Sequence, residues 1–128
     1  MNDELIIKLQ ETHQQSQEIE EKFKVVEQQL DELQKFASSL EDLDKNSNKE
    51  ILASLGKGVY IKSDIKDEKL FVDVGSGVLV RKSIEESRQV VEEQSKKLNE
   101  IRIQLVVENE TIAEKMQGLI EKVEEFRE

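Results

Sequence analysis

Apolar residues recur at alternating spacings of four and three along the first third of the chain. This seam covers eleven positions, nine of them apolar: Leu5, Leu9, Thr12, Ser16, Ile19, Phe23, Val26, Leu30, Leu33, Ala37 and Leu40. Charged residues and Gln fill most of the positions between them. A narrow stripe with this spacing is typical of a coiled-coil helix, which buries the stripe against a partner helix. We therefore predict a long helix over residues 1–45.

A second stretch with helical periodicity runs over residues 83–128. Ser83 is a good N-cap, and Glu86 three residues later completes a capping box. The apolar series that follows recurs every seven residues at Ile84, Val91, Leu98, Leu105 and Ile112, with Ile101 as an intervening member. It continues in a shifted phase through Met116, Leu119, Val123 and Phe126. The shift suggests a stutter near Asn109 in a second long helix.

The two predicted helices have similar lengths, and the chain offers no third helix to cover their stripes. The simplest solution is a long antiparallel two-helix coiled coil, joined by residues 46–82. The composition fits this fold, because charged residues make up 38% of the chain, aromatic residues only 4%, and Pro is absent. We therefore predict a mainly α protein with a small β part in one domain, 1–128. Both termini should lie at the end of the coil away from the connection.

The connecting residues contain a repeated glycine turn. The segments "LGKGV" at 55–59 and "VGSGV" at 74–78 have the same pattern. Their turn glycines are Gly56, Gly58, Gly75 and Gly77. Glycine takes positive φ at little cost, so each segment is expected to form a three-residue hairpin loop.

Four short strands are predicted on either side of these turns. Their alternating apolar residues are Ile51, Ala53, Leu55, Val59, Ile61, Ile65, Leu70, Val72, Val74, Val78 and Val80. This two-residue period predicts two β-hairpins with one apolar face. The polar link "KDEK" at 66–69 could form a further turn, and the sequence leaves open whether the second and third strands pair.

Two such hairpins are incomplete on their own. A two-stranded hairpin is marginally stable in water, and its unpaired edges invite other strands. The coiled coil can cover only part of the apolar face because it leaves the hairpins from one end. Closing the strands of several chains into a barrel would remove the edges. We therefore predict an obligate oligomer in which the hairpins assemble into an intersubunit β-barrel.

The charge and the residue types exclude several kinds of function. The net charge of −10 disfavours binding to nucleic acid and to anionic membranes. Without Cys, neither disulfides nor zinc–thiolate sites can form. The single histidine, His13, makes neither a metal site nor a catalytic triad, and "GKG" at 56–58 lacks the rest of a phosphate loop. We therefore predict no catalytic residue, no metal and no cofactor. The acidic start "MNDELIIKLQ" is neither a signal peptide nor a membrane span, which indicates a cytoplasmic protein.

The hairpin region resembles a known family closely. The segments that carry the resemblance are "LGKGVYIKSDI" at 55–65 and "LFVDVGSGVLVRKSIEES" at 70–87. A glycine-bracketed hairpin, a Val-Asp-Val-Gly-x-Gly turn and a Ser-capped second helix are similar to the alpha-type subunit of prefoldin. The resemblance extends over essentially the whole chain. Beta-type subunits of that family have a single hairpin, so two hairpins favour the alpha type.

The resemblance implies a function and a set of partners. It implies an archaeal-like hetero-hexamer of two alpha-type and four beta-type prefoldin subunits, with coiled coils projecting from a barrel platform. Members of the family are holdases, that is, ATP-independent chaperones rather than enzymes. They capture unfolded client proteins at the coil tips and pass them to a group II chaperonin. The alternative function is a structural coiled-coil tether or adaptor with strand-mediated oligomerisation.

Apolar residues gather where the free ends of an antiparallel helix pair would meet. The group comprises Leu5, Ile6, Ile7, Leu9, Met116, Leu119, Ile120, Val123 and Phe126. Six of these residues fit the seam and are expected to pack between the helices, whereas Ile6, Ile7 and Ile120 fall off it. Off-seam apolar residues on a polar coil invite a partner, so we expect this group to contact non-native polypeptide. A wider local core is the alternative.

Overall fold

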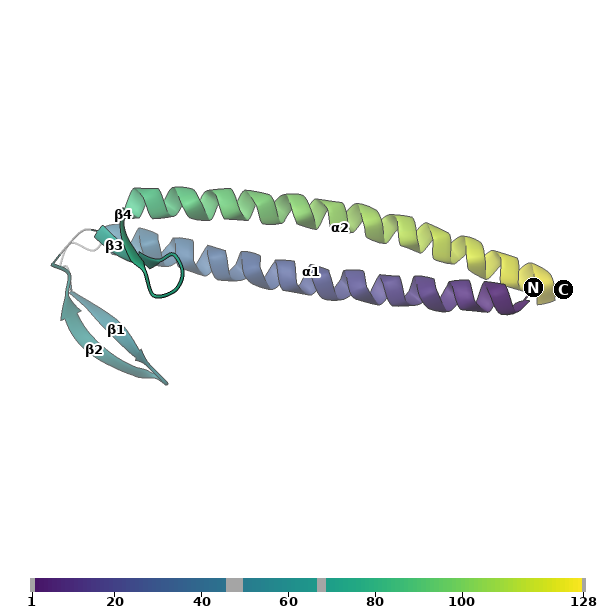
Figure 1. Cartoon of the computed structure of the whole chain (residues 1–128), viewed down its shortest axis with the longest axis horizontal. Helices are drawn as coiled ribbons and strands as arrows, with labels where there is room; N and C mark the ends of the chain where they lie inside the picture. Colours follow the sequence, from purple (N-terminus) through teal and green to yellow (C-terminus); the bar gives the residue numbers. More distant parts are fainter. Residues whose placement is uncertain (1, 46–49, 67–68, 128) are drawn as a thin grey trace. The chain divides into compact units, whose positions relative to one another are not determined.

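The computed structural model describes residues 2–45, 50–66 and 69–127 (Figure 1). Its elements follow the order α1 (Asn2–Lys45), β1 (Glu50–Gly56), β2 (Val59–Asp64), β3 (Lys69–Asp73), β4 (Leu79–Ser83) and α2 (Ile84–Arg127). The predicted mainly α fold with two small hairpins is therefore confirmed. Part of the predicted helix stop "DKNSN" at 44–48 and part of the link "KDEK" at 66–69 lie outside the described residues.

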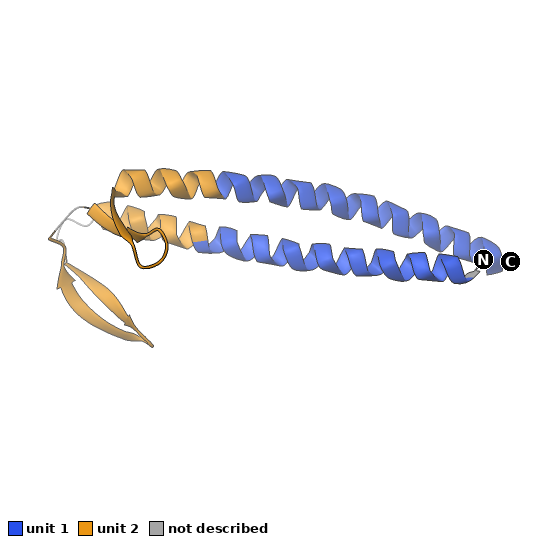
Figure 2. Ribbon diagram, viewed as in Figure 1, with its two compact units in different colours: residues 1–32, 95–128 blue, residues 33–94 orange. Residues whose placement is uncertain are grey.

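The chain divides into two compact units (Figure 2). Unit 1 comprises residues 1–32 and 95–128, so it contains segments of both helices and both ends of the chain. Unit 2 comprises residues 33–94, which include the remaining turns of the helices and the four strands.

Unit 1 is an antiparallel pair of helical segments with a thin apolar core (Figure 2). Ile19, Val26 and Leu105 form the buried cluster, and Phe23, Leu30, Leu98 and Ile112 pack against it. Arg102 of α2 reaches Glu27 of α1, with 3.6 Å between the guanidinium nitrogen and the carboxylate oxygen. Thr12 is fully buried, and its hydroxyl donates a 2.6 Å hydrogen bond to the carbonyl of Lys8. The buried hydroxyl of Thr12 therefore has a hydrogen-bond partner, as buried polar groups usually do.

The predicted seam of α1 is confirmed along its whole length. All eleven positions from Leu5 to Leu40 are buried or half-buried. The only other described residue of α1 with a covered side chain is Leu43. Because the seam holds two positions in seven, the helix buries only a narrow stripe, and its remaining surface stays in water.

The predicted seam of α2 was wrong at its one intervening member, Ile101. Ile101 is 43% exposed, whereas its neighbour Arg102 is half-buried. From Val91 onward, the side chain that is covered after a member of the seven-residue series lies four residues later and not three. Arg102, for example, follows Leu98 by four residues. A charged residue can occupy this seam because the stem of an arginine covers apolar surface while its guanidinium reaches a carboxylate. The same spacing continues past the exposed Asn109 to Met116, so the structure has no stutter there.

The strands of unit 2 form two separate antiparallel sheets, β1 with β2 and β3 with β4. The register places Ala53 opposite Ile61 and Val72 opposite Val80. Strands β2 and β3 do not pair within the described residues. The sequence left open whether the second and third strands pair, and the structure shows two separate hairpins instead.

The two glycine turns have the same backbone conformation. In the first, Gly56 pairs with Val59, and Lys57 and Gly58 between them have φ of 53° and 79°. In the second, the amide of Val78 donates a 3.0 Å hydrogen bond to the carbonyl of Gly75. Positive φ at both central residues is the signature of a type I′ turn. In the first hairpin, the pairing of Gly56 with Val59 leaves a two-residue loop, one residue shorter than predicted. In the second hairpin, the amide of Val74 also donates a 3.0 Å hydrogen bond to the carbonyl of Val78, so the predicted three-residue loop, Gly75 to Gly77, is closed around the turn. The expected positive φ is confirmed at all four turn glycines.

A polar side chain braces each turn from the same relative position. The amide of Gly56 donates to the Ser54 hydroxyl at 3.2 Å, and the amide of Gly75 donates to the Asp73 carboxylate at 2.8 Å. Each acceptor lies two residues before its glycine, which is the local hydrogen-bond pattern of Asx and Ser turns. The sequence repeat therefore corresponds to a repeat of structure.

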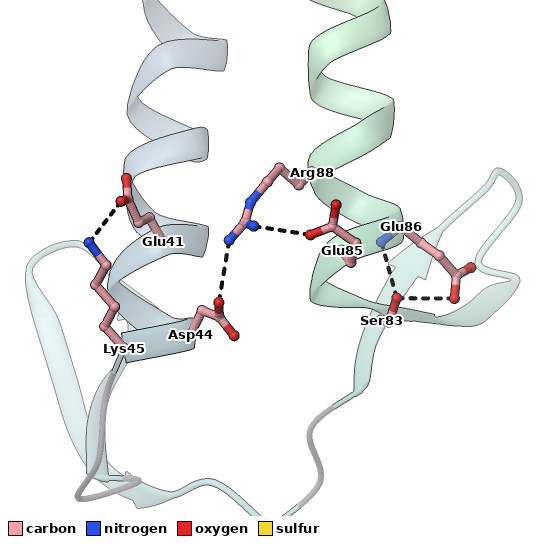
Figure 3. Close-up of polar contacts among 7 residues, drawn as sticks. All are labelled: Glu41, Asp44, Lys45, Ser83, Glu85, Glu86 and Arg88. Carbon is pink, nitrogen blue, oxygen red and sulfur yellow. Dashed lines mark hydrogen bonds and ion pairs between the residues drawn. The ribbon is translucent and has the colours of Figure 1, made fainter.

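Helix α2 begins at the predicted N-cap (Figure 3). The amide of Glu86 donates a 3.0 Å hydrogen bond to the Ser83 hydroxyl, and this hydroxyl lies 3.1 Å from a carboxylate oxygen of Glu86. Beside it, Arg88 contacts Glu85 at 3.0 Å and reaches Asp44, near the end of α1, at 3.5 Å. These ion pairs are largely exposed, so they orient the helix ends more than they stabilise them.

Lys45 forms an exposed ion pair with Glu41 one helical turn earlier, at 2.9 Å (Figure 3). The hydrogen bond from Lys45, together with its positive charge, lowers the pKa of the Glu41 carboxyl. A cation in the last turn of a helix also faces the partial negative charge of the helix end. The pair therefore helps α1 to extend to Lys45.

We expect Ser83→Ala to destabilise the start of α2 by about 1 kcal/mol, because it removes the acceptor for the Glu86 amide. Thermal unfolding followed by circular dichroism would show a lower midpoint. Ser39→Ala is the matched control, since Ser39 lies within α1 and its exposed hydroxyl donates only to the Lys35 carbonyl. Alanine is the better helix former at that position, so an equal loss of stability in both variants would contradict the cap.

Candidate functional site

The structure brings the predicted end residues together in unit 1, where the first turns of α1 lie beside the last turns of α2 (Figure 1). We call this group the coil-end cluster: Leu5, Ile6, Ile7, Leu9, Met116, Leu119, Ile120, Val123 and Phe126. Leu119 is buried, while Leu5, Leu9, Met116 and Val123 are half-buried. These five residues therefore pack between the helices, as their seam positions predicted.

The exposed part of the coil-end cluster differs from the prediction at one residue. Ile6, Ile7 and Ile120 are 47%, 52% and 39% exposed, which agrees with their off-seam positions. Phe126 was expected to pack in the seam but is 56% exposed. It lies in the last turn of α2, which ends at Arg127. The cluster therefore presents four large apolar side chains to solvent.

The first hairpin has apolar residues on both faces. Residues directly opposite each other in an antiparallel pair share a face, so Ile51, Ala53 and Ile61 lie on one side. Leu52 and Tyr60 lie on the other, and they are 64% and 60% exposed. The prediction of a single apolar face was therefore wrong for this hairpin.

The second hairpin repeats this arrangement. Leu70, Val72 and Val80 share one face, as predicted, and the first two are half-buried. Phe71 and Leu79 lie on the opposite face and are both exposed. The Arg81 guanidinium lies 5.7 Å from the centre of the Phe71 ring, a cation–π distance. The missed residues had a sequence signal, because apolar residues in both phases of a strand indicate burial on both faces.

The remaining predicted assembly residues lie around the turns and strand ends. Leu55 and Val59 flank the first turn, Val74 and Val78 flank the second, and Ile65 follows the end of β2. The first four are 54–68% exposed, whereas Ile65 is half-buried. Large exposed aliphatic side chains on marginal hairpins need a partner surface, so the hairpins are the candidate assembly site.

A third exposed apolar group, near the middle of α2, was not predicted. Ile103, Val106 and Val107, which we call the mid-coil patch, are 60%, 42% and 56% exposed. Val106 borders a groove of about 390 Å³ between the helices of unit 1. Ile101, absent from the seam, borders another groove of about 460 Å³ together with Val25. A sequence signal was present in the run "IRIQLVV" at 101–107, which has apolar residues off the seam.

The described residues contain no group of three or more His, Cys, Asp or Glu side chains that could hold a metal ion. His13 is exposed on α1. No helix in the described part of the chain is long and apolar enough to cross a membrane. The candidate sites are therefore apolar contact surfaces.

One comparison with known proteins identifies a family. A family model described as "Prefoldin subunit" matches residues 12–126. No curated protein sequence matches the chain. Among solved structures, the chain is similar to a filamentous PFD from Methanocaldococcus jannaschii, with 20% sequence identity and a TM-score of 0.76. The match covers 94% of this chain and 98% of that one. At this identity the structural likeness concerns the fold, and the family model supplies the assignment.

Proposed function

The chain belongs to the prefoldin family, and we propose that it is an alpha-type subunit of an ATP-independent holdase that acts in the cytoplasm. Prefoldins are a non-enzymatic chaperone family, so a chaperone-type subunit is the function at the level of the family. The observation that supports holding of unfolded protein is the coil-end cluster. Four of its large apolar side chains are 39–56% exposed at the end of a polar coil.

Capture at the coil-end cluster would use weak contacts. Unfolded proteins expose apolar segments of no fixed sequence, so a receptor needs adaptable apolar patches more than one shaped pocket. Several such coils in one assembly raise the effective concentration, so overall binding can exceed that of a single coil by about a hundredfold or more. Weak individual contacts also permit release without ATP, by transfer to a second binder. We propose that a group II chaperonin is this second binder.

Assembly would occur through the hairpins. The described residues of the chain form four strands, so two copies bring eight, and four single-hairpin beta-type subunits bring the same number. These counts suit two closed barrels, which would remove the strand edges and cover apolar residues on the hairpins. The two hairpins per chain support the alpha type. We therefore propose a hetero-hexamer of two alpha-type and four beta-type subunits.

The proposed function is tested by an aggregation assay on the assembled complex. The chain, co-expressed with a single-hairpin partner subunit, should suppress aggregation of a chemically denatured enzyme at near-stoichiometric ratio without nucleotide. The expected mass is roughly 80 to 90 kDa, estimated from six chains of about this size. A requirement for ATP would contradict the proposal. Larger species of graded size would instead indicate open-ended assembly, as in the filamentous archaeal structure.

The alternative function is a coiled-coil tether or adaptor with a strand-mediated oligomerisation head. It accounts for the seam and the hairpins, but it gives no role to the exposed Ile6, Ile7, Ile120 and Phe126. A stable homodimer that leaves the denatured enzyme to aggregate would favour this alternative.

A further inference from the structure

The mid-coil patch forms one continuous surface on α2. Val106 follows Ile103 by three residues and Val107 follows it by four, so all three side chains are neighbours on the helix. Their exposed fractions lie between 42% and 60%. The residues that cover the helix pair at this level are instead Leu105 and Arg102. The patch therefore adds little to the packing of the pair.

A groove beside the patch extends its apolar surface onto α1. The groove has a volume of about 390 Å³, and Val106 lines it together with Ile19 and Phe23. Ile19 is buried in the core and Phe23 is half-buried against it. A side chain inserted between the helices here would therefore contact the core of unit 1 as well as the patch.

Local propensity gives no reason for β-branched residues at these positions. Ile and Val are weaker helix formers than Gln, Lys or Glu, which fill comparable exposed positions of this coil. Several adjacent exposed apolar residues also favour aggregation unless a partner covers them. Their presence therefore indicates a binding surface more than a structural one.

The charges around the patch define what the partner should carry. Glu20 and Glu110 line the groove with one cation, Lys24. Glu100 precedes Ile103 by one helical turn and is exposed. Arg102, the other nearby cation, already contacts Glu27 at 3.6 Å. The surroundings are therefore acidic, as is the whole chain with its net charge of −10, and they favour a cationic partner.

We propose that the mid-coil patch is a second client-binding surface, which selects apolar segments flanked by Lys or Arg in non-native polypeptides. This inference rests on the proposed holdase function and adds a substrate class to it. An aliphatic residue of the client enters the groove against Val106 and Phe23. Flanking cations of the client approach Glu20 and Glu110.

The test measures the binding of two fluorescent peptides to the full chain by anisotropy. Both peptides have the same Ile-, Val- and Leu-rich centre, which is flanked by Lys in one and by Glu in the other. The double variant I103Q/V107Q should weaken binding of the Lys-flanked peptide about tenfold. Its helix should persist, because Gln is a better helix former than Ile or Val. Val90→Gln, an exposed valine elsewhere on α2, is the matched control and should bind as the unchanged chain does.

The charge preference is tested separately. Glu110→Gln should reduce the preference for the Lys-flanked peptide about two- to threefold, as expected for one exposed charge. Equal binding of the two peptides by the unchanged chain would overturn the proposal, as would unchanged binding by I103Q/V107Q. A self-associated species that I103Q/V107Q abolishes would also overturn it, because a second copy would then be the occupant.

Failure of this inference can be told apart from failure of the proposed function. If the complex suppresses aggregation while I103Q/V107Q binds the Lys-flanked peptide normally, the holdase function stands and the mid-coil patch is not a client site. If the complex neither suppresses aggregation nor binds either peptide, the holdase function itself fails.

Discussion

Val72→Asp is expected to abolish assembly while leaving the two helices folded. Val72 faces Val80 across the second hairpin, and its side chain is half-buried even in the single chain. A closed barrel would bury this face further. An ionised carboxylate without a partner is costly to bury, by several kcal/mol or more, because it loses its hydration. The expected result is a species of about the monomer mass, 14.8 kDa, beside unassembled partner subunit.

The control for this variant places the same charge in the same hairpin without burying it. Ser76 lies in the turn, with φ of 53°, a conformation that aspartate tolerates. Ser76→Asp should therefore assemble normally. Mass measurement with co-expressed partner, together with circular dichroism to verify the helices, decides the outcome. If Val72→Asp assembles as completely as Ser76→Asp does, the face of Leu70, Val72 and Val80 is not the buried one.

The opposite face of the hairpins is a second candidate surface for subunit contacts. Leu52, Tyr60, Phe71 and Leu79 are each 60–64% exposed, so a barrel that buries one face still leaves a second apolar surface. A strand with apolar residues in both phases can pack on both sides. The hairpins therefore have enough apolar surface for more than a single layer of subunit contacts.

The features that followed from local patterns were predictable. The α1 seam, the Ser83 cap and the positive φ of the turn glycines each depend on residues within a few positions of one another. Spacing and side-chain chemistry determine them before any long-range contact forms. The family resemblance then placed these elements in one fold, which the structure confirms.

The errors arose where hydrophobicity alone does not decide burial. The apolar side chain of Ile101 favours a seam position, but the half-buried Arg102 continues the seam and pairs with Glu27. Phe126 fits the spacing yet lies at a helix end, where coverage is incomplete. Leu52 and Phe71 fall in the second phase of their strands, so the alternation of the first phase does not identify them. In each case the partner element, rather than the local pattern, determines the environment.

Replacing the off-seam residues of the coil-end cluster should weaken client capture at least tenfold while assembly persists. The variant I6Q/I7Q/I120Q removes three side chains that are 39–52% exposed and pack little within the pair. Gln continues a helix better than Ile, so the coil should keep its stability. The loss should be large because several coils bind each client together. A weaker contact at every coil therefore lowers the overall affinity for the client by more than the loss at a single coil. Aggregation suppression at increasing ratios of complex to denatured enzyme measures the effect.

Substitution is a sharper test here than removal of the ends. Deleting the first ten and last ten residues would also remove Leu5, Leu9 and the buried Leu119, which hold the pair together. A loss of capture could then reflect frayed helices. Phe36→Gln is the matched control, since Phe36 is 46% exposed on α1 outside the cluster. Undiminished suppression by I6Q/I7Q/I120Q, with its assembly intact, would exclude these residues as the client contact. The same loss with Phe36→Gln would show that any exposed apolar residue of the coil contributes equally, and the coil ends would then have no special role.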